Sequence, residues 1–202
     1  AKITNNPEAY DAYLRGLTVL RNVEQSSLGS APQFLEQAVR LDPGFATAWA
    51  LLSRMRAYEF FDGDHAQRTA ARVALDAGLR LEPDLPEVQL AQGYFQYYVE
   101  QDYNAAAARF EQLLGKWPNN AEILEALGLI VRRQGHWDRA RAYLDRAVEL
   151  EPLSPGARAA ASDVRSWTRD FDGSLRFIDE ALNIAPDTAD FIALKALVYQ
   201  AQ

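Results

Sequence analysis

The sequence contains no cysteine, only two histidines and no excess of positive charge. Without cysteine the chain forms no disulfide and offers no thiolate to a metal, and its redox compartment is left open. Its 21 Lys and Arg against 28 Asp and Glu leave a net charge of −7. This balance argues against binding to nucleic acid or anionic membranes, because affinity for phosphate comes from clustered Lys and Arg.

Long apolar runs are also missing. No segment approaches the roughly 20 apolar residues that a membrane-spanning helix needs, and no signal peptide is recognisable. We therefore expect no membrane insertion and a cytoplasmic location. The chain begins at Ala1 rather than at Met, which indicates a piece of a longer protein.

Motifs that carry catalysis are absent as well. The chain has neither GxGxxG nor GxxxxGK[ST], and no serine lies in a recognised hydrolase motif. Asp62, Asp64 and His65 could ligate a metal, but their spacing fits neither a calcium loop nor a zinc signature, and Asp64 suits a helix cap equally well. His136 follows Gly135 and is typical of a polar turn. We expect no enzyme active site, no metal and no cofactor.

A short phrase ending in proline recurs along the chain. "AVELEP" closes at Pro152, and related phrases close at prolines 43, 83, 118 and 186. The spacings of 40, 35, 34 and 34 residues lie in the range typical of repeat proteins.

Three columns of residues stay in phase with these prolines. Large apolar residues stand eight positions before each proline: Leu35, Leu75, Phe110, Leu144 and Ile178. Mostly small residues stand five positions before: Ala38, Gly78, Leu113, Ala147 and Ala181. Small residues stand twelve positions before: Ala31, Ala71, Ala106, Ala140 and Ser174. Spacings of three and four residues place the columns on one face of a helix that ends at the proline.

A second helix follows each proline, with a small residue ten positions on: Ser53, Gly93, Gly128, Ser162 and Ala196. Asn6 before Pro7, Ser154 before Pro155, and Asp187 are suited to cap the starts of such helices. Proline ends one helix and takes the preceding residue out of the α region. The sequence thus predicts an all-α fold of five helical hairpins followed by a terminal helix.

These residues resemble the tetratricopeptide repeat (TPR) family. The best copy covers residues 121–152, where Leu127-Gly128, Gly135, Ala140 and Ala147 match the family's pattern. The resemblance implies a right-handed α-α superhelix, a solenoid, as a single domain over residues 1–202. The repeats then run over residues 7–45, 46–85, 86–120, 121–154 and 155–188, with a half-repeat at 189–202. Within the family, residues 6–16 and 93–114 are most similar to the C-terminal TPR arrays of bacterial multidomain signalling proteins, of the adenylate-cyclase type or the winged-helix regulators.

Several segments depart from the pattern. Residues 22–32 and 59–67 hold surplus residues, and one extra residue lies near Gln101; stacking predicts that all three line one rim. In the fifth unit Arg158 and Arg165 take apolar positions, so they need acidic partners or solvent, and we expect this unit to be the weakest.

The resemblance implies that the first helix of each hairpin lines a concave groove, with exposed residues 7, 11, 14 and 15 positions after the proline. This rule selects the candidate partner-binding residues Arg54, Tyr58, Tyr94, Tyr97, Tyr98, Arg132, Arg133 and Trp167. Tyr, Trp and Arg dominate binding hot spots. Alternatively, some tyrosines pack between repeats, since Tyr97 and Tyr98 cannot both point the same way. Phe60 and Phe61 either contact a partner at the rim or fold back over their own hairpin.

The terminal helix over residues 190–200 is apolar on more than one face. Either the parent chain continues beyond it or the helix packs against another molecule, which allows self-association.

The predicted function is a non-catalytic protein–protein interaction scaffold. Its groove docks a peptide or protein with an acidic element, as a module of a larger bacterial signalling protein. The alternatives are a sensor of a small ligand and a regulatory fragment of a larger enzyme such as an adenylate cyclase.

Overall fold

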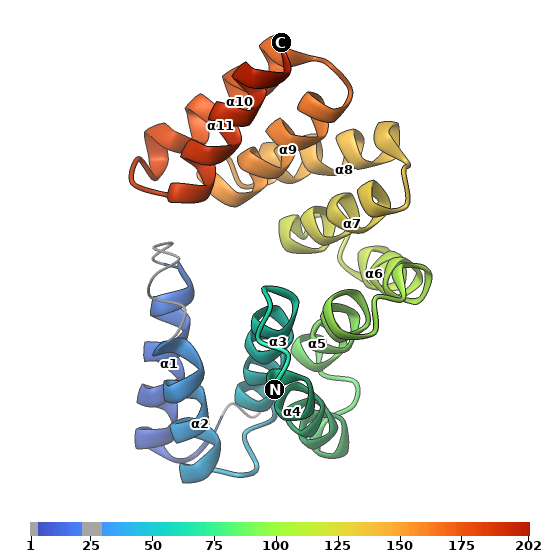
Figure 1. The fold of residues 1–202 in the computed structure, drawn as a ribbon. Helices are drawn as coiled ribbons and strands as arrows, with labels where there is room; N and C mark the ends of the chain where they lie inside the picture. The colour runs from blue at the N-terminus through green and yellow to red at the C-terminus, as the bar shows by residue number, and fades with distance from the viewer. Residues whose placement is uncertain (1–3, 22–29) are drawn as a thin grey trace. The chain divides into compact units, whose positions relative to one another are not determined.

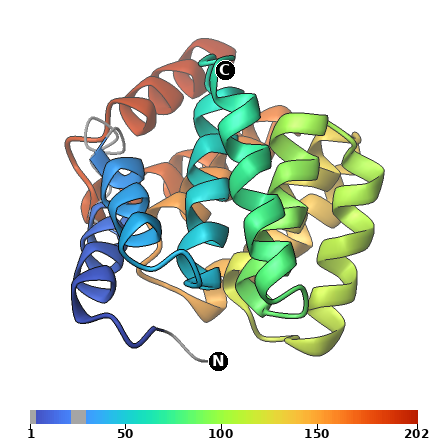
Figure 2. The same ribbon diagram turned by 90° about the horizontal axis from the view of Figure 1, so that it is seen from below.

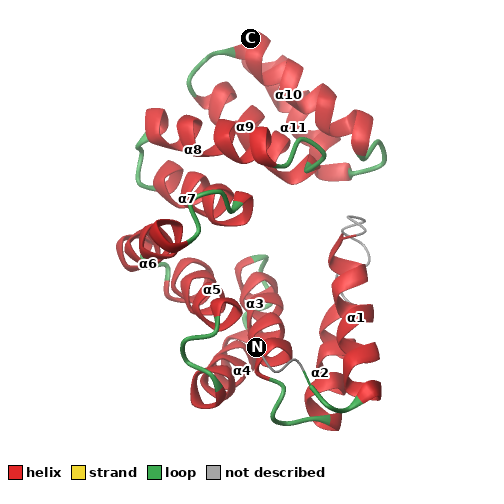
Figure 3. Ribbon diagram, turned by 180° about the vertical axis from the view of Figure 1, so that it is seen from behind, coloured by secondary structure: helices red, strands yellow, loops and turns green. Residues whose placement is uncertain are grey.

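The structure is a computed structural model that describes residues 4–21 and 30–202, for Leu20 and Arg21 the backbone alone. Within these ranges the chain forms helices, turns and loops, and none of the described residues is in a strand (Figure 3). The helices are α1 (Pro7–Arg21), α2 (Ala31–Leu41), α3 (Ala46–Phe61), α4 (Gln67–Leu81), α5 (Pro86–Phe95), the π-helix η2 (Gln96–Glu100), α6 (Tyr103–Lys116), α7 (Ala121–Arg133), α8 (Trp137–Leu150), α9 (Pro155–Trp167), α10 (Phe171–Ile184) and α11 (Ala189–Ala201). The predicted all-α fold is confirmed.

The repeated proline marks the end of a helix each time. Helices α2, α4, α6, α8 and α10 all end two residues before one of the five prolines. The three columns predicted to face the core are buried throughout, including Leu35, Phe110 and Leu144 at full burial. Burying a side chain of this size contributes about 1.5–3 kcal/mol relative to leaving it exposed, so these columns hold the hairpins together.

Contacts divide the chain into two compact units, Ala1–Ala106 and Ala107–Gln202. In the first unit, α1 packs on α2, and α3 packs on both α4 and α5. Helices α3 and α4 lie side by side along their length (Figure 2). In the second unit, α7 pairs with α8 and α9 with α10, while α8 contacts α9 and α11 contacts α10 and α9 (Figure 1). The single domain over residues 1–202 and its repeat boundaries stay predictions.

Two of the three helix caps predicted from the sequence are confirmed, Asn6 and Ser154. The side-chain oxygens of Asn6, Asn120 and Ser154 accept backbone N–H groups three residues on, at 3.0–3.2 Å. Asp187 was predicted to cap the last helix, and this is wrong. Thr188 is the N-cap residue of α11 and makes no side-chain capping bond, because the helix starts one residue later than the aspartate requires.

The surplus residues are accommodated in different ways. In the second hairpin, α3 continues to Phe61, so residues 59–61 of the surplus segment are helical and residues 62–66 form the turn before α4. Near Gln101 the extra residue widens the helix into the π-turn η2, and Gln101 takes a left-handed φ of 54°. Residues 22–29 of the first surplus segment lie outside the described residues, so the common rim stays a prediction.

The two arginines of the fifth unit have the acidic partners predicted for them. Arg165 is 3% exposed, lies 2.6 Å from Asp145 and 3.8 Å from Asp170, and covers the Phe177 ring. Arg158 pairs with Glu180 and also donates to the carbonyl of Pro152. Charged contacts therefore replace part of the apolar packing that the other hairpins have.

Candidate functional site

The first candidate surface is a group of touching aromatic rings in the first unit, which we call the tyrosine cluster: Tyr58, Phe61, Tyr94, Tyr97 and Tyr98. Tyr98 is its centre. The Tyr98 ring stacks on Tyr94 at 5.8 Å between centroids and meets Tyr58 edge-on at 5.7 Å. Phe61 lies 5.0 Å from Tyr98 and 6.0 Å from Tyr97. Such offset and edge-on pairs stabilise one another beyond the area that they bury, so the cluster is a preformed surface.

Three helical elements supply these rings. Tyr58 and Phe61 come from the last turn of α3, Tyr94 from α5, and Tyr97 and Tyr98 from η2. A π-turn holds one more residue per turn than an α-helix, which lets both Tyr97 and Tyr98 contact the same neighbours. Their rings lie only 4.7 Å apart.

Tyr97 does not offer a surface for binding. It is 2% exposed and packs against Tyr103 as well as Phe61. A partner cannot reach a side chain that is this buried, so the prediction that Tyr97 contacts a partner directly is wrong. Tyr97 instead packs beneath the more exposed rings of Phe61 and Tyr98. Tyr58, Tyr94 and Tyr98 are half-buried and keep part of each ring accessible.

Arg54 belongs to the same surface. Its guanidinium carbon lies 4.5 Å from the centroid of the Tyr94 ring. A cation over an aromatic face is held there by the ring's quadrupole. The positive charge is thereby fixed beside the tyrosine cluster.

The two adjacent phenylalanines have different surroundings. Phe60 is half-buried on the hydrophobic core of its own hairpin and touches the ring of His65. Phe61 joins the tyrosine cluster. The fold-back alternative therefore describes Phe60, and the sequence reasoning missed that Phe61 continues the row of tyrosines. The extension of α3 through its surplus residues is what brings it there.

The second candidate surface lies in the second unit. Arg132 of α7 forms an ion pair with Asp163 of α9. Trp167, also on α9, donates its indole N–H to Asp163 at 3.1 Å and stacks on Trp137 at 6.2 Å. Trp167 is 68% exposed, and Arg133 is exposed as well. Trp137 was not a candidate from the sequence, because it starts α8 and not the first helix of a hairpin.

Glu125 stands at a groove position of α7 and has an altered acidity. Burial raises its pKa to about 7, and the like charges of Glu122 and Glu151 add to the rise. A methyl group at Gly156 would lie 3.5 Å from the Glu125 carboxylate, so the carboxylate borders the start of α9. Glu125 stands seven residues after Pro118, one of the positions that the groove rule covers. The spacing did not predict the shift in its pKa, which depends on burial, on Glu122 of α7 and on Glu151 in the turn after α8.

The possible metal ligands are engaged in local structure. Asp64 accepts from the backbone N–H of Ala66 and from the Gln67 side chain ahead of α4. His65 contacts the ring of Phe60. His136, which was predicted to be a polar turn residue and not a metal ligand, is the N-cap residue of α8. Across residues 4–21 and 30–202, no group of three or more His, Asp or Glu side chains is arranged to hold a metal ion.

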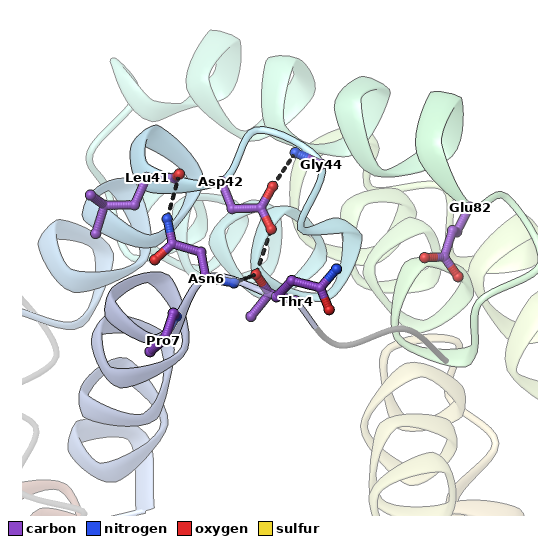
Figure 4. A pocket seen from close by; sticks show the side chains of 8 residues that line it. Thr4, Asn6, Pro7, Leu41, Asp42, Gly44 and Glu82 are labelled. Atoms are coloured by element: carbon purple, nitrogen blue, oxygen red, sulfur yellow. Dashed lines mark hydrogen bonds between the residues drawn. The ribbon is translucent and has the colours of Figure 1, made fainter.

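A pocket of about 640 Å³ lies at the start of the first unit (Figure 4). It is lined by Thr4, Asn5, Asn6, Pro7, Leu41, Asp42, Gly44 and Glu82. The polar groups of its wall bond one another. Thr4 donates to Asp42, Asp42 accepts from the Gly44 N–H at 2.9 Å, and Asn6 donates to the Leu41 carbonyl at 2.9 Å. These bonds tie α1 to the turn after α2, and we assign the pocket a structural role.

Family models for the tetratricopeptide repeat match residues 96–158 and 131–198. Together they span residues 96–198, about half of the chain. This chain belongs to the TPR family. Repeats of this family are non-catalytic scaffolds on which proteins assemble, and the helical hairpins described above are their structural unit.

Two curated proteins are similar to the chain. Anaphase-promoting complex subunit 3 of Schizosaccharomyces pombe is 25% identical over 178 residues, which are 87% of this chain and 25% of that protein. Cellulose synthase operon protein C of Pseudomonas fluorescens is 29% identical over 168 residues, 79% of this chain and 12% of that protein. The chain thus spans a quarter or less of the length of these relatives.

Solved structures share the fold. A thermophilic TPR protein from Thermus thermophilus has a TM-score of 0.77 at 17% identity, covering 95% of this chain and 99% of that one. PilW, a type IV pilus biogenesis factor, has a TM-score of 0.68 at 18% identity, covering 97% and 86%. YrrB, described as a TPR protein with an unusual peptide-binding site, has a TM-score of 0.56 at 18% identity, covering 95% and 94%. These matches confirm the fold, stacked hairpins of a TPR solenoid.

The part of the chain that the structure describes has no helix both long and apolar enough to span a bilayer.

Proposed function

We propose that the tyrosine cluster, with Arg54, is the docking surface on which this scaffold binds a peptide segment of a partner protein. The carrying observation is that three half-buried tyrosines from α3, α5 and η2 are held in mutual contact. Ordering them costs little on binding, because their neighbours already fix the rings. Each ring offers apolar area and a hydroxyl that can donate or accept a hydrogen bond.

In this proposal, Arg54 binds the acidic side chain of the partner peptide. Arg132, in the other unit, forms an ion pair with Asp163. The Arg54 guanidinium lies over the Tyr94 ring, so an acidic side chain of the peptide would meet its charge while its apolar neighbours cover Tyr94 and Tyr98. Arg133 and Trp167 form a second candidate contact in the other unit.

The scaffold is proposed to work inside a larger assembly. The relative from Schizosaccharomyces pombe is by its name a subunit of a complex, which favours a scaffold inside a larger assembly. The proposal that the chain is a module of a bacterial signalling protein rests on the likeness of residues 6–16 and 93–114, and the cytoplasmic location stays a prediction. A sensor of a small ligand is the alternative, and small molecules therefore form a separate arm of the binding experiment.

The test selects ligands from a displayed library of random short peptides. The bait is the whole chain, and the comparison baits are Tyr94→Ala/Tyr98→Ala and Arg54→Ala. Truncating hot-spot residues costs about 2 kcal/mol or more, so selected peptides should lose at least about tenfold in affinity for the double variant, tenfold being about 1.4 kcal/mol. Peptides selected on the native chain should be enriched in Asp or Glu, and Arg54→Ala should remove that enrichment.

A matched control keeps the test specific. Arg68→Ala/Val73→Ala removes one charge and one apolar side chain from the exposed face of α4, and it should bind selected peptides like the native chain. Circular dichroism checks that every variant keeps its helices. Equal binding by the cluster variant and the native chain would refute the assignment. A rise in melting temperature with small molecules but with no peptide would favour the sensor.

A further inference from the structure

The tyrosine cluster and Arg54 together form a surface rich in hydrogen-bond donors. Tyr58, Tyr94 and Tyr98 each carry a phenolic hydroxyl. Arg54 beside them carries five N–H donors and no acceptor. No member of the cluster has a carboxylate or an amide side chain. A ligand that matches this surface therefore offers acceptors and has few donors of its own.

The rings of the cluster are fixed by one another before any ligand arrives. The ring of the buried Tyr97 lies 4.7 Å from that of Tyr98. Phe61 approaches Tyr98 at 49° between the ring planes, and Tyr58 approaches it at 85°. A surface that is already ordered loses little entropy on binding, and a ligand that is equally ordered keeps this advantage.

Two common forms of a bound peptide do not match this surface. A strand binds by extending the open edge of a sheet, and none of the described residues is in a strand. A helix packs closely where the other side offers small residues, as Gly128 of α7 does for Leu144 of α8. All five members of the cluster are large aromatic residues. The carbonyls of a helix also bond within the helix, so its backbone has little to offer the donors of the cluster.

A proline-rich segment in the polyproline II conformation has the required properties. This left-handed helix has three residues per turn and no internal hydrogen bonds, so its carbonyls can accept from a protein surface. Proline has no N–H, and its ring fixes φ before binding. Segments of this kind dock on aromatic-lined sites in other domains.

We propose that the partner segment bound by the tyrosine cluster is proline-rich, adopts the polyproline II conformation and carries an acidic residue, an inference that rests on the docking surface proposed above. Proline rings pack on Tyr94 and Tyr98, and backbone carbonyls accept from their hydroxyls. The acidic residue meets Arg54, whose guanidinium carbon lies 4.5 Å from the centroid of the Tyr94 ring. Because polyproline II presents the same face every three residues, two prolines with two residues between them contact the cluster together.

The first measurement reads this pattern from peptides selected on the whole chain. Short random peptides are displayed, and those that bind the native chain but lose affinity for Tyr94→Ala/Tyr98→Ala are sequenced. Pairs of prolines with two residues between them, near an Asp or Glu, should be several times more frequent than in the unselected library. Equal frequencies would overturn the proline-rich ligand.

The second measurement titrates a selected proline-rich peptide, in fluorescent form, with the whole chain. The control peptide replaces both prolines with alanine, which restores two N–H donors and releases φ but keeps the acidic residue. The proline form should bind at least about tenfold more tightly, a difference of about 1.4 kcal/mol. Equal affinities would overturn the proposal.

A third measurement tests the hydroxyls separately from the rings. Tyr94→Phe/Tyr98→Phe keeps both rings and removes both hydroxyls, and it should weaken the peptide about threefold to tenfold, because each hydrogen bond contributes a modest net amount. Tyr143→Phe is the matched control. Tyr143 is a half-buried tyrosine of α8, outside the cluster, and its variant should bind like the native chain. Unchanged affinity of the double variant would overturn the hydrogen bonds on which this choice of ligand depends.

The outcomes separate the ligand class from the docking surface. Peptides that need Tyr94 and Tyr98 but keep their affinity when alanine replaces proline would overturn the polyproline II ligand and leave the docking surface in place. Peptides that bind Tyr94→Ala/Tyr98→Ala as tightly as the native chain would overturn both, and so would a selection that yields no binding peptide.

Discussion

Replacing Glu125 with glutamine should stabilise the protein at high pH and not at low pH. The side chain is partly buried against the start of α9, and burial together with Glu122 and Glu151 raises its pKa from 4.5 to about 7. The folded pKa lies above the unfolded one, so the folded chain binds this proton more tightly. Stability from this group is then fully present below about pH 4.5 and is lost as the pH rises through about 7.

The magnitude follows from the two pKa values. Each pH unit between them corresponds to about 1.4 kcal/mol, so the ionised carboxylate destabilises the folded chain by at most about 3.5 kcal/mol. Partial exposure lets water screen the charge, so we expect Glu125→Gln to raise the unfolding free energy by about 1–3 kcal/mol at high pH. Glutamine keeps the shape of the protonated acid, so the difference should shrink towards zero as the pH falls.

The assay is urea denaturation followed by circular dichroism, at several values between about pH 5.5 and pH 8.5. Glu149→Gln is the matched control, because it removes the same charge from an exposed carboxylate that pairs with Arg146, and exposed pairs contribute little. A stability difference between wild type and Glu125→Gln that does not change with pH would refute the reasoning.

Three further predictions concern the scaffold. Gly128→Ala should lower the unfolding free energy by about 1–2 kcal/mol in the same assay, because its methyl group overlaps Leu144 and overpacking outweighs the gain in helix propensity; a more stable variant would contradict this. Gln101→Gly should raise stability by about 1 kcal/mol, because Gln101 holds a φ of 54° that costs an L-residue energy; no change would show that the turn is unstrained. Amide hydrogen exchange should be faster in residues 155–186 than in residues 121–152, because α9 packs mainly alanine and arginine against its neighbours and the weakest unit of a solenoid opens first; equal protection would contradict a weak fifth hairpin.

The repeats were predictable because their signals are local. A large residue such as Leu144 with Ala140 and Ala147 on one face follows from the 3.6-residue period alone. A proline that ends each helix acts on its own neighbours. The predicted charge partners of Arg165 also followed from a general rule, that a buried arginine needs acids.

The candidate sites were predictable only as a set of positions. Spacing from each proline selected Tyr94, Tyr97 and Tyr98 together, but it did not say that Tyr97 is buried. That outcome depends on η2, where one extra residue turns the two rings differently. The spacing also did not predict the contact between the rings of Phe61 and Tyr98. That contact depends both on the length of α3 and on the position of η2.

The sequence by itself determined that a helix ends before each of the five prolines, which face of that helix is buried, and that hairpins repeat, since the first two depend on residues within one or two turns and the third on their recurrence. The tertiary structure decided which rings remain accessible, that Asp163 neutralises Arg132, and that Glu125 holds its proton near neutral pH. These properties depend on distances between side chains of different helices and on how much water those helices exclude.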